Sequence, residues 1–106
     1  MEESRRKYER VSVDFPVVYR IKNMNILGRA MNASNEGMMV ESYLSLKTAE
    51  QILQFWDKNR GYKLNMRFTY RSKAYRPEAE IRHFHLDFLG KERCRYLAGF
   101  FIPKIE

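Results

Sequence analysis

Two short groups of basic and polar residues are the parts of this sequence best suited to binding chemistry. Arg5, Arg6 and Arg10 lie close together near the start of the chain, with Arg6 and Arg10 four residues apart. An arginine guanidinium is a planar fork that can hold a phosphate or a planar acceptor edge through two hydrogen bonds. Asn32 and Ser34 are two residues apart, so on a strand their side chains project from the same face. These residue types point to an anionic, planar ligand.

Gly37 completes the second group, since glycine permits the positive φ that many tight turns require. Asn, Ser and Gly are, however, also the usual residues of a polar hairpin turn. A basic segment at the start of a chain is often only a solvated tail. From the residues alone, a turn and a tail therefore remain alternatives to a ligand site.

Most of the chain that would position these groups shows the two-residue period of strands. Apolar residues occupy the odd positions of 11–19 and the even positions of 62–70, which predicts half-buried strands. Pro16 has no N–H for a ladder, so it is expected at an edge or a bulge. Further strands are expected over 24–33, from Met38 onward, over 78–86 and over 95–102, with 72–77 as a turn.

The period changes between Leu46 and Lys58, where apolar residues recur at steps of three and four. This spacing predicts one amphipathic helix that covers the core, with Thr48 and Gln51 as a capping box and Gly61 as the stop. The fold class is therefore mainly β: a small six-stranded antiparallel β-barrel with one amphipathic helix. Residues 1–10 are expected to form a flexible N-terminal ligand-binding arm, and residues 11–106 the barrel domain.

Composition narrows the possible partners. The chain of 106 residues has a formal net charge of +7, which favours an anionic partner such as a nucleotide, a nucleic acid or a membrane surface. The apolar run over 97–102 is too short to cross a bilayer, so no membrane insertion is expected. Cys94 is the single cysteine, which excludes an intramolecular disulfide and fits a reducing cytoplasm, so a cytoplasmic location is predicted.

The two groups together resemble the signature of the PilZ domain, the bacterial receptor module for cyclic di-GMP. Arg6-Lys7-Tyr8-Glu9-Arg10 resembles its RxxxR motif, and Asn32-Ala33-Ser34-Asn35-Glu36-Gly37 resembles its (D/N)xSxxG motif. Ala98-Gly99-Phe100-Phe101 is similar to the last barrel strand of the family. The family commonly carries a helix after that strand, whereas the helical pattern here lies over 46–58.

The resemblance implies a role for each matching residue. Arg6 and Arg10 would bind guanine and phosphate of cyclic di-GMP, with Arg5 assisting. Asn32 and Ser34 would hydrogen-bond a guanine edge, and Gly37 would shape the turn. It further implies a receptor without a cofactor. Ligand binding would order the N-terminal arm and present a changed surface to a downstream protein effector. No triad spacing, phosphate-binding glycine loop or carboxylate pair indicates an enzyme.

Two other patterns suggest different functions. His83, His85 and Asp87 alternate on a predicted strand and could begin a metal site, but the sequence has no other histidine to complete it. Nucleic-acid binding is the alternative function, because small basic barrels with surface aromatics bind single strands. The residues considered for that role are Tyr62, Tyr70, Tyr75, Phe84, Arg67, Arg71, Arg76 and Arg82. The preferred interpretation is that most of these aromatics belong to the core and the arginines to a solvated face, so nucleic acid is not the expected partner.

Overall fold

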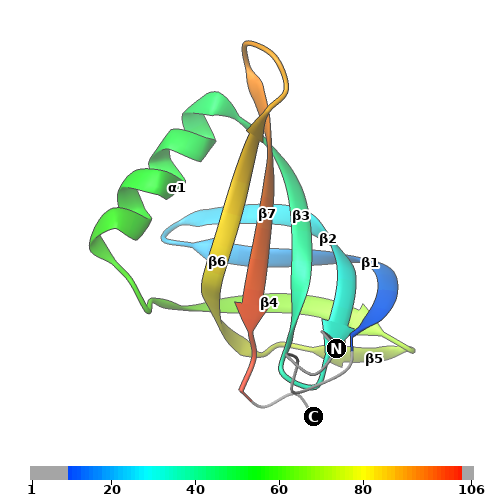
Figure 1. Ribbon diagram of the computed structural model, residues 1–106. Coiled ribbons are helices and arrows are strands. Elements are labelled where there is room, and N and C mark those ends of the chain that lie inside the picture. Colours follow the sequence, from blue (N-terminus) through cyan, green and yellow to red (C-terminus); the bar gives the residue numbers. More distant parts are fainter. Residues whose placement is uncertain (1–9, 104–106) are drawn as a thin grey trace, which may run out of the picture.

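The alternating segments of the chain form the strands of one antiparallel sheet, and the segment with helical spacing forms the helix (Figure 1). The computed structural model describes residues 10–103. The elements are β1 (Val11–Ile21), β2 (Met24–Ser34), β3 (Gly37–Ser45), α1 (Leu46–Lys58), β4 (Lys63–Tyr70), β5 (Lys73–Tyr75), β6 (Glu78–Phe88) and β7 (Arg93–Phe101).

Six of the strands close into a ring. The sheet order is β1-β2-β3-β7-β6-β4-β5, and an additional pairing of β1 with β4 closes the ring. In Figure 1, β3, β6 and β7 cross β1, β2 and β4 at a steep angle, which gives the sheet a barrel-like shape. Pro16 lies in β1 directly before Val17, where pairing with β4 begins, so its missing N–H costs no bond to β4. The predicted mainly β fold with one helix is confirmed.

The seventh strand, β5, lies in a segment predicted as a turn. Lys73–Tyr75 pairs only with β4, outside the ring. The chain reverses through Arg71 and Ser72, whose φ values are 53° and 66°. Tight hairpins with two positive φ values usually contain Asn-Gly or a similar pair. Because neither residue here is glycine or asparagine, the sequence carries no sign of this hairpin.

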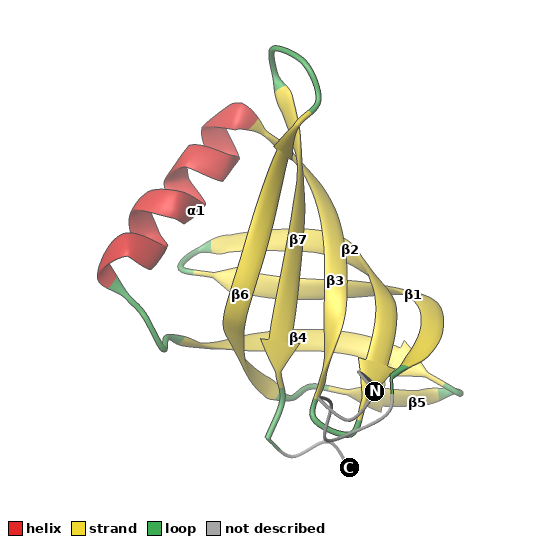
Figure 2. Cartoon of the chain, in the orientation of Figure 1, coloured by secondary structure: helices red, strands yellow, loops and turns green. Residues whose placement is uncertain are grey.

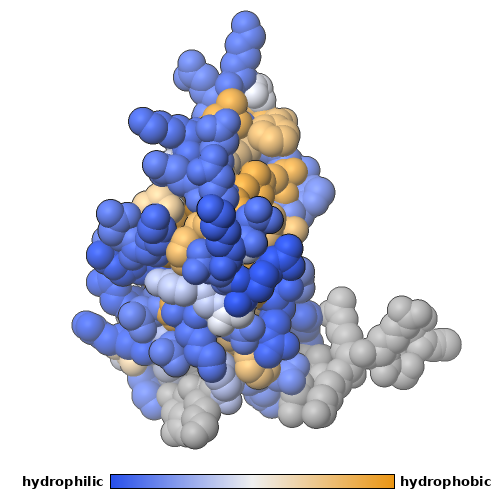
Figure 3. Space-filling model, turned by 90° about the vertical axis from the view of Figure 1, so that its left-hand side faces the viewer, coloured by the Kyte–Doolittle hydropathy of each residue, from blue (hydrophilic) through white to orange (hydrophobic). Residues whose placement is uncertain are grey.

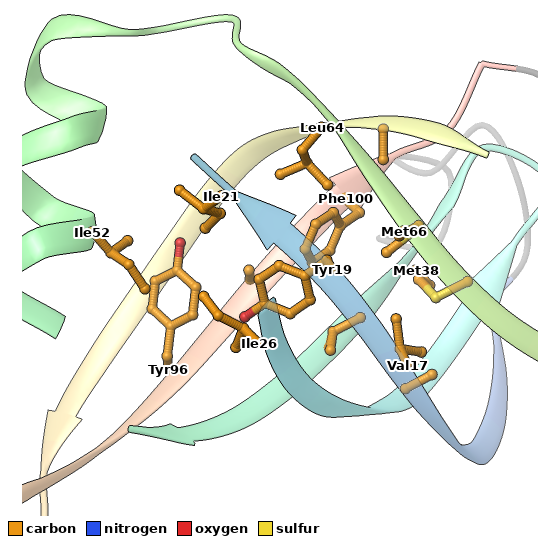
Figure 4. Packing of buried hydrophobic residues seen from close by; sticks show 14 of the residues in the cluster. Val17, Tyr19, Ile21, Ile26, Met38, Ile52, Leu64, Met66, Tyr96 and Phe100 are labelled. Atoms are coloured by element: carbon orange, nitrogen blue, oxygen red, sulfur yellow. The ribbon is translucent and has the colours of Figure 1, made fainter. Parts of the chain in front are cut away.

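Aromatic and aliphatic side chains fill the inside of the ring (Figure 4). Tyr19 and Tyr96 are both fully buried there. The Tyr19 hydroxyl lies 3.0 Å from the Ser42 hydroxyl in a buried hydrogen bond. Burial raises the pKa of Tyr19 far above its usual range, because water no longer solvates a phenolate. Since the interior is occupied by side chains, a ligand has to bind on the outer face.

The helix α1 lies against the side of the ring (Figure 2). Ser45 is the N-cap residue and accepts a hydrogen bond from the Thr48 amide at 3.1 Å, so the predicted capping box at Thr48 is wrong by one turn. Ala49, Ile52 and Trp56 are buried, and the Trp56 Nε1 donates to the Tyr96 hydroxyl at 3.1 Å. The predicted covering role of the helix is confirmed.

The molecule is largely hydrophilic when viewed from the α1 side, with apolar patches between the polar side chains (Figure 3). The outward residues of α1 explain part of this, since they are mostly charged or amide side chains. Within residues 10–103, no helix is long and apolar enough to cross a membrane.

Candidate ligand-binding site

A β-bulge decides the direction in which Asn32 and Ser34 point. The even-numbered residues of β2 up to Ala30 face the core. Ala30 and Asn32 pair with consecutive residues of β3, so Met31 between them is an extra residue. An extra residue shifts the two-residue alternation by one. Asn32 and Ser34 therefore both lie on the outer face, two residues apart as predicted.

Arg10 contacts Asn32 across 22 positions of sequence. The Arg10 Nη1 donates to the Asn32 Oδ1 at 3.0 Å. The pairing of Ser12 with Asn32 explains this proximity, because it places the beginning of β1 beside the end of β2. The structure thus brings together the last arginine of the first group and the asparagine of the second. Arg5 and Arg6 lie outside the described residues.

Ser34 stands at the base of a short hairpin turn. It pairs with Gly37, which leaves Asn35 and Glu36 as the loop between β2 and β3. The Glu36 amide donates to the Ser34 Oγ at 3.2 Å, and the Glu36 carbonyl accepts from the Ile102 amide at 2.7 Å. The loop is therefore fixed both by Ser34 and by the residue that follows β7.

The structure gives Gly37 a different role from the one predicted. Its φ is not positive, so the expectation that it supplies a left-handed turn residue is wrong. Gly37 is the first residue of β3 and pairs with Phe101 of β7. A Cβ atom at this position would overlap the carbonyl oxygen of Phe100 and lie 2.9 Å from the Phe100 carbonyl carbon. Glycine is required here because two backbones approach closely, not because the chain turns.

The outer face is hollowed beside the hairpin. A pocket of about 140 Å³ is lined by Arg10, Ser34, Glu36, Gly37, Met38, Arg82, His83, Gly99, Phe100 and Phe101. Three of the residues predicted for the site are in this lining, and Asn32 is bonded to one of them.

Arg82 and His83 were not predicted as part of this site. The Arg82 guanidinium carbon lies 4.0 Å from the centre of the Phe101 ring, and its Nε lies 3.5 Å from Oε1 of Glu80. Both residues come from β6, about fifty positions after Asn32, and no local motif links them to it. Only strand pairing brings them to this pocket. Arg10 and Arg82 give the pocket two cationic side chains against the one acidic side chain of Glu36, which suits an anion.

Two residues of the histidine pattern of β6, His85 and Asp87, are bonded to each other in a network with Arg95. His83 and His85 do share one face, as predicted, since they pair with Gly99 and Leu97 of β7. The His85 Nε2 lies 2.8 Å from Oδ1 of Asp87, while Oδ2 of Asp87 accepts from Arg95. Both bonds lower the pKa of Asp87, and the bond with His85 has the larger effect. Among the residues that the structure describes, no group of three or more His, Cys, Asp or Glu side chains could hold a metal ion.

The aromatics considered for base stacking do not form a surface platform. Tyr62, Tyr70 and Tyr75 are half-buried and pack against the core. Their rings contact Phe55, Phe15 and Phe68, with centroids 4.8, 5.2 and 5.2 Å apart. Phe84, with 38% of its surface exposed, is the one large exposed aromatic of the four. This agrees with the preferred interpretation that most of these aromatics are core residues.

A larger hollow lies elsewhere on the outer face. It has a volume of about 700 Å³ and is bounded by β2, β3 and the start of α1. Its charged residues already have partners, because Arg29 pairs with Asp14 at 2.6 Å and Glu41 pairs with Arg95. None of the predicted site residues lines it. Compared with this hollow, the smaller pocket is the better candidate for the site that the two motifs predict.

Comparisons with known proteins address the fold. No family model matches the sequence, and the search of curated proteins also gave no match. Among solved structures, the chain is similar to the PilZ domain with c-di-GMP of YcgR from Escherichia coli, with a TM-score of 0.66 and 16% identity over 92% of this chain and 77% of that one. It is also similar to the Bacillus subtilis inhibitor of motility (MotI/DgrA), with a TM-score of 0.53 and 19% identity over 89% of this chain and 42% of that one. The fold expected from the two motifs is confirmed, because this chain shares its fold with a solved PilZ domain.

Proposed function

We propose that this domain binds cyclic di-GMP at the pocket beside the β2–β3 hairpin. The observation that carries the proposal is the hydrogen bond of 3.0 Å from Arg10 to Asn32. It joins the two sequence motifs at one place on a fold whose solved neighbour contains the same nucleotide. In this proposal Arg10 binds the ligand together with Arg5 and Arg6, while Asn32, Ser34 and Gly37 form the edge facing them.

The chemistry of each group suits the ligand. Cyclic di-GMP has two phosphates and two guanines, so its receptor must neutralise charge and bind a purine edge. An arginine fork can bond a phosphate bidentately or take the O6 and N7 acceptors of guanine. The amide of Asn32 and the hydroxyl of Ser34 supply neutral donors and acceptors on the same outer face. Gly37 allows β3 to approach β7 and so positions the hairpin.

The proposed output is a change of surface, not a chemical reaction. Binding of the nucleotide to Arg5 and Arg6 would bring residues 1–9 against the pocket. A downstream protein would then recognise the rearranged segment next to the ring. This makes the domain a cytoplasmic receptor for a second messenger, with no cofactor and no catalytic activity of its own.

Titration calorimetry with cyclic di-GMP tests the proposal. Arg10→Ala should weaken binding by about tenfold to a hundredfold or more, because one or two charge-assisted contacts of about 1.5–3 kcal/mol are lost. Arg10→Lys should also lose most of the affinity, because lysine keeps the charge but lacks the fork. Arg67, an exposed arginine of β4 outside the pocket, provides the matched control Arg67→Ala.

The outcomes separate the function from the site. Absence of binding by the unchanged domain would reject the proposed function. Equal affinities for Arg10→Ala and Arg67→Ala would reject the site while leaving the ligand in place. All variants should keep their melting temperature within a few degrees, since both side chains are exposed. A single-stranded oligonucleotide in the same assay should bind weakly and lose affinity as salt is added.

A further inference from the structure

One row of residues runs across four strands on the outer face of the ring. Asn32 of β2 pairs with Met39 of β3, Met39 with Gly99 of β7, and Gly99 with His83 of β6. Paired residues of neighbouring strands face the same side of a sheet. With about 4.8 Å between strands, the three spacings from Asn32 to His83 amount to about 14 Å along the sheet.

The surface of the sheet is recessed at Gly99, in the middle of this row, because glycine has no side chain. A Cβ atom on Gly99 would overlap Cε1 and Nε2 of the His83 ring and lie 3.1 Å from its Cδ2. The imidazole therefore lies over the backbone of β7 and borders the same pocket as Arg10 and Ser34. Glycine at position 99 leaves room for the ring in this position.

A second bulge places Arg82 next to His83. Ile81 and His83 pair with consecutive residues of β7, so Arg82 between them is an extra residue. Bulges turn a side chain away from the regular alternation and occur often beside functional sites. Here the bulge lets two consecutive residues, an arginine and a histidine, border one pocket. About half of the Arg82 side chain is exposed.

The charged groups that border the pocket with His83 are mostly cationic. Arg10 lies before β1 and Arg82 on β6, and Glu36 of the hairpin is the acidic group in the lining. Glu80 is already within 3.5 Å of Arg82. On the far side of His83, a cleft toward α1 also contains Asp57 and Arg60. An anion in the pocket would therefore face cations from two directions.

We propose that β6 supplies a third ligand-binding segment, in which Arg82 and His83 bind an anionic phosphate of the nucleotide opposite Arg10. This inference rests on the proposed function and adds two residues that lie outside both sequence motifs. An imidazole N–H and an arginine guanidinium can both donate hydrogen bonds to a phosphate oxygen.

Calorimetry with cyclic di-GMP tests the inference. His83→Gln and Arg82→Gln should each bind the nucleotide about tenfold more weakly than the unchanged domain. His85→Gln is the matched control, because His85 lies two residues along the same face but is bonded to Asp87. It should keep the affinity of the unchanged domain.

A measurement on the unchanged domain tests the role of His83 even if the variants fail to fold. Imidazole NMR signals of His83 should shift on addition of the nucleotide, while those of His85 should stay in place. If the nucleotide binds but His83→Gln keeps the affinity of the unchanged domain, or if the His83 signals do not move, the role of β6 is refuted and the proposed function stands. If the unchanged domain does not bind the nucleotide, both proposals fail.

Discussion

The structural role assigned to Gly37 makes a sharp prediction for Gly37→Ala. The added methyl group would overlap the Phe100 carbonyl oxygen, so β3 must move away from β7 at the end of their ladder. Backbone atoms yield less easily than the end of a flexible side chain, and overpacking of this kind costs about 1–3 kcal/mol. For a domain of this length, that corresponds to a melting temperature lower by about 5–20 °C.

Thermal unfolding followed by circular dichroism would measure this loss, with Gly37→Asn as the discriminating variant. Asparagine tolerates a positive φ better than other residues. If Gly37 were needed only for a left-handed turn, Gly37→Asn would retain most of the stability that Gly37→Ala loses. We expect the asparagine variant to be at least as unstable as the alanine variant, because its larger side chain meets the same carbonyl.

Ser34→Ala separates the loss of stability from the loss of ligand binding. The Ser34 Oγ accepts one hydrogen bond, from the Glu36 amide in an exposed turn, so its removal should cost about 1 kcal/mol or less. It should nevertheless weaken cyclic di-GMP binding, whereas Gly37→Ala should weaken binding and stability together. An alanine at position 37 that leaves the melting temperature unchanged would refute the close-approach argument.

Two further predictions concern the core and the acid range. Ser42→Ala should destabilise the domain by about 1–3 kcal/mol in urea unfolding, because the buried Tyr19 hydroxyl loses its partner. Adding Tyr19→Phe should recover part of this loss, and strictly additive effects would contradict the pairing. Asp87 has a pKa lowered from 3.8 in the folded state. Its stabilising contribution is thus fully present above the unfolded value and is lost as the pH falls through the folded value. Asp87→Asn should therefore show a smaller drop in melting temperature between about pH 4 and pH 2, and parallel drops would count against the network.

Local periodicity was enough to predict the elements whose side chains alternate without interruption. The helix was predicted over 46–58 and is observed over the same residues, since its apolar stripe is long and regular. The strand predicted over 62–70 is β4, one residue shorter. β5 was not predicted, because its turn uses two residues that rarely adopt positive φ.

The candidate site could be predicted only where it coincides with a sequence motif. The motifs themselves indicated Arg10, Asn32 and Ser34, and the structure places these residues together. Arg82 and His83 could not be linked to them, because the connection runs through Met39 and Gly99 on two intervening strands. Pairing between distant strands depends on the whole ladder and leaves no local pattern in the sequence.

The candidate site lies beside irregularities of the sheet. At these positions the two-residue alternation of the sequence gives the least information about which face a side chain occupies. β1 has a register shift between Ser12 and Phe15, β2 has its extra residue at Met31, and β6 has its extra residue at Arg82. All three adjoin the row that contains Asn32 and His83. A bulge bends its strand and reverses the faces of the residues beyond it. A ring whose interior is already filled can expose a ligand-binding surface only on its outer face, and these bulges direct polar side chains there. The loss of alternation near Asn32, which made this strand hard to define from sequence, is thus a consequence of how the site is built.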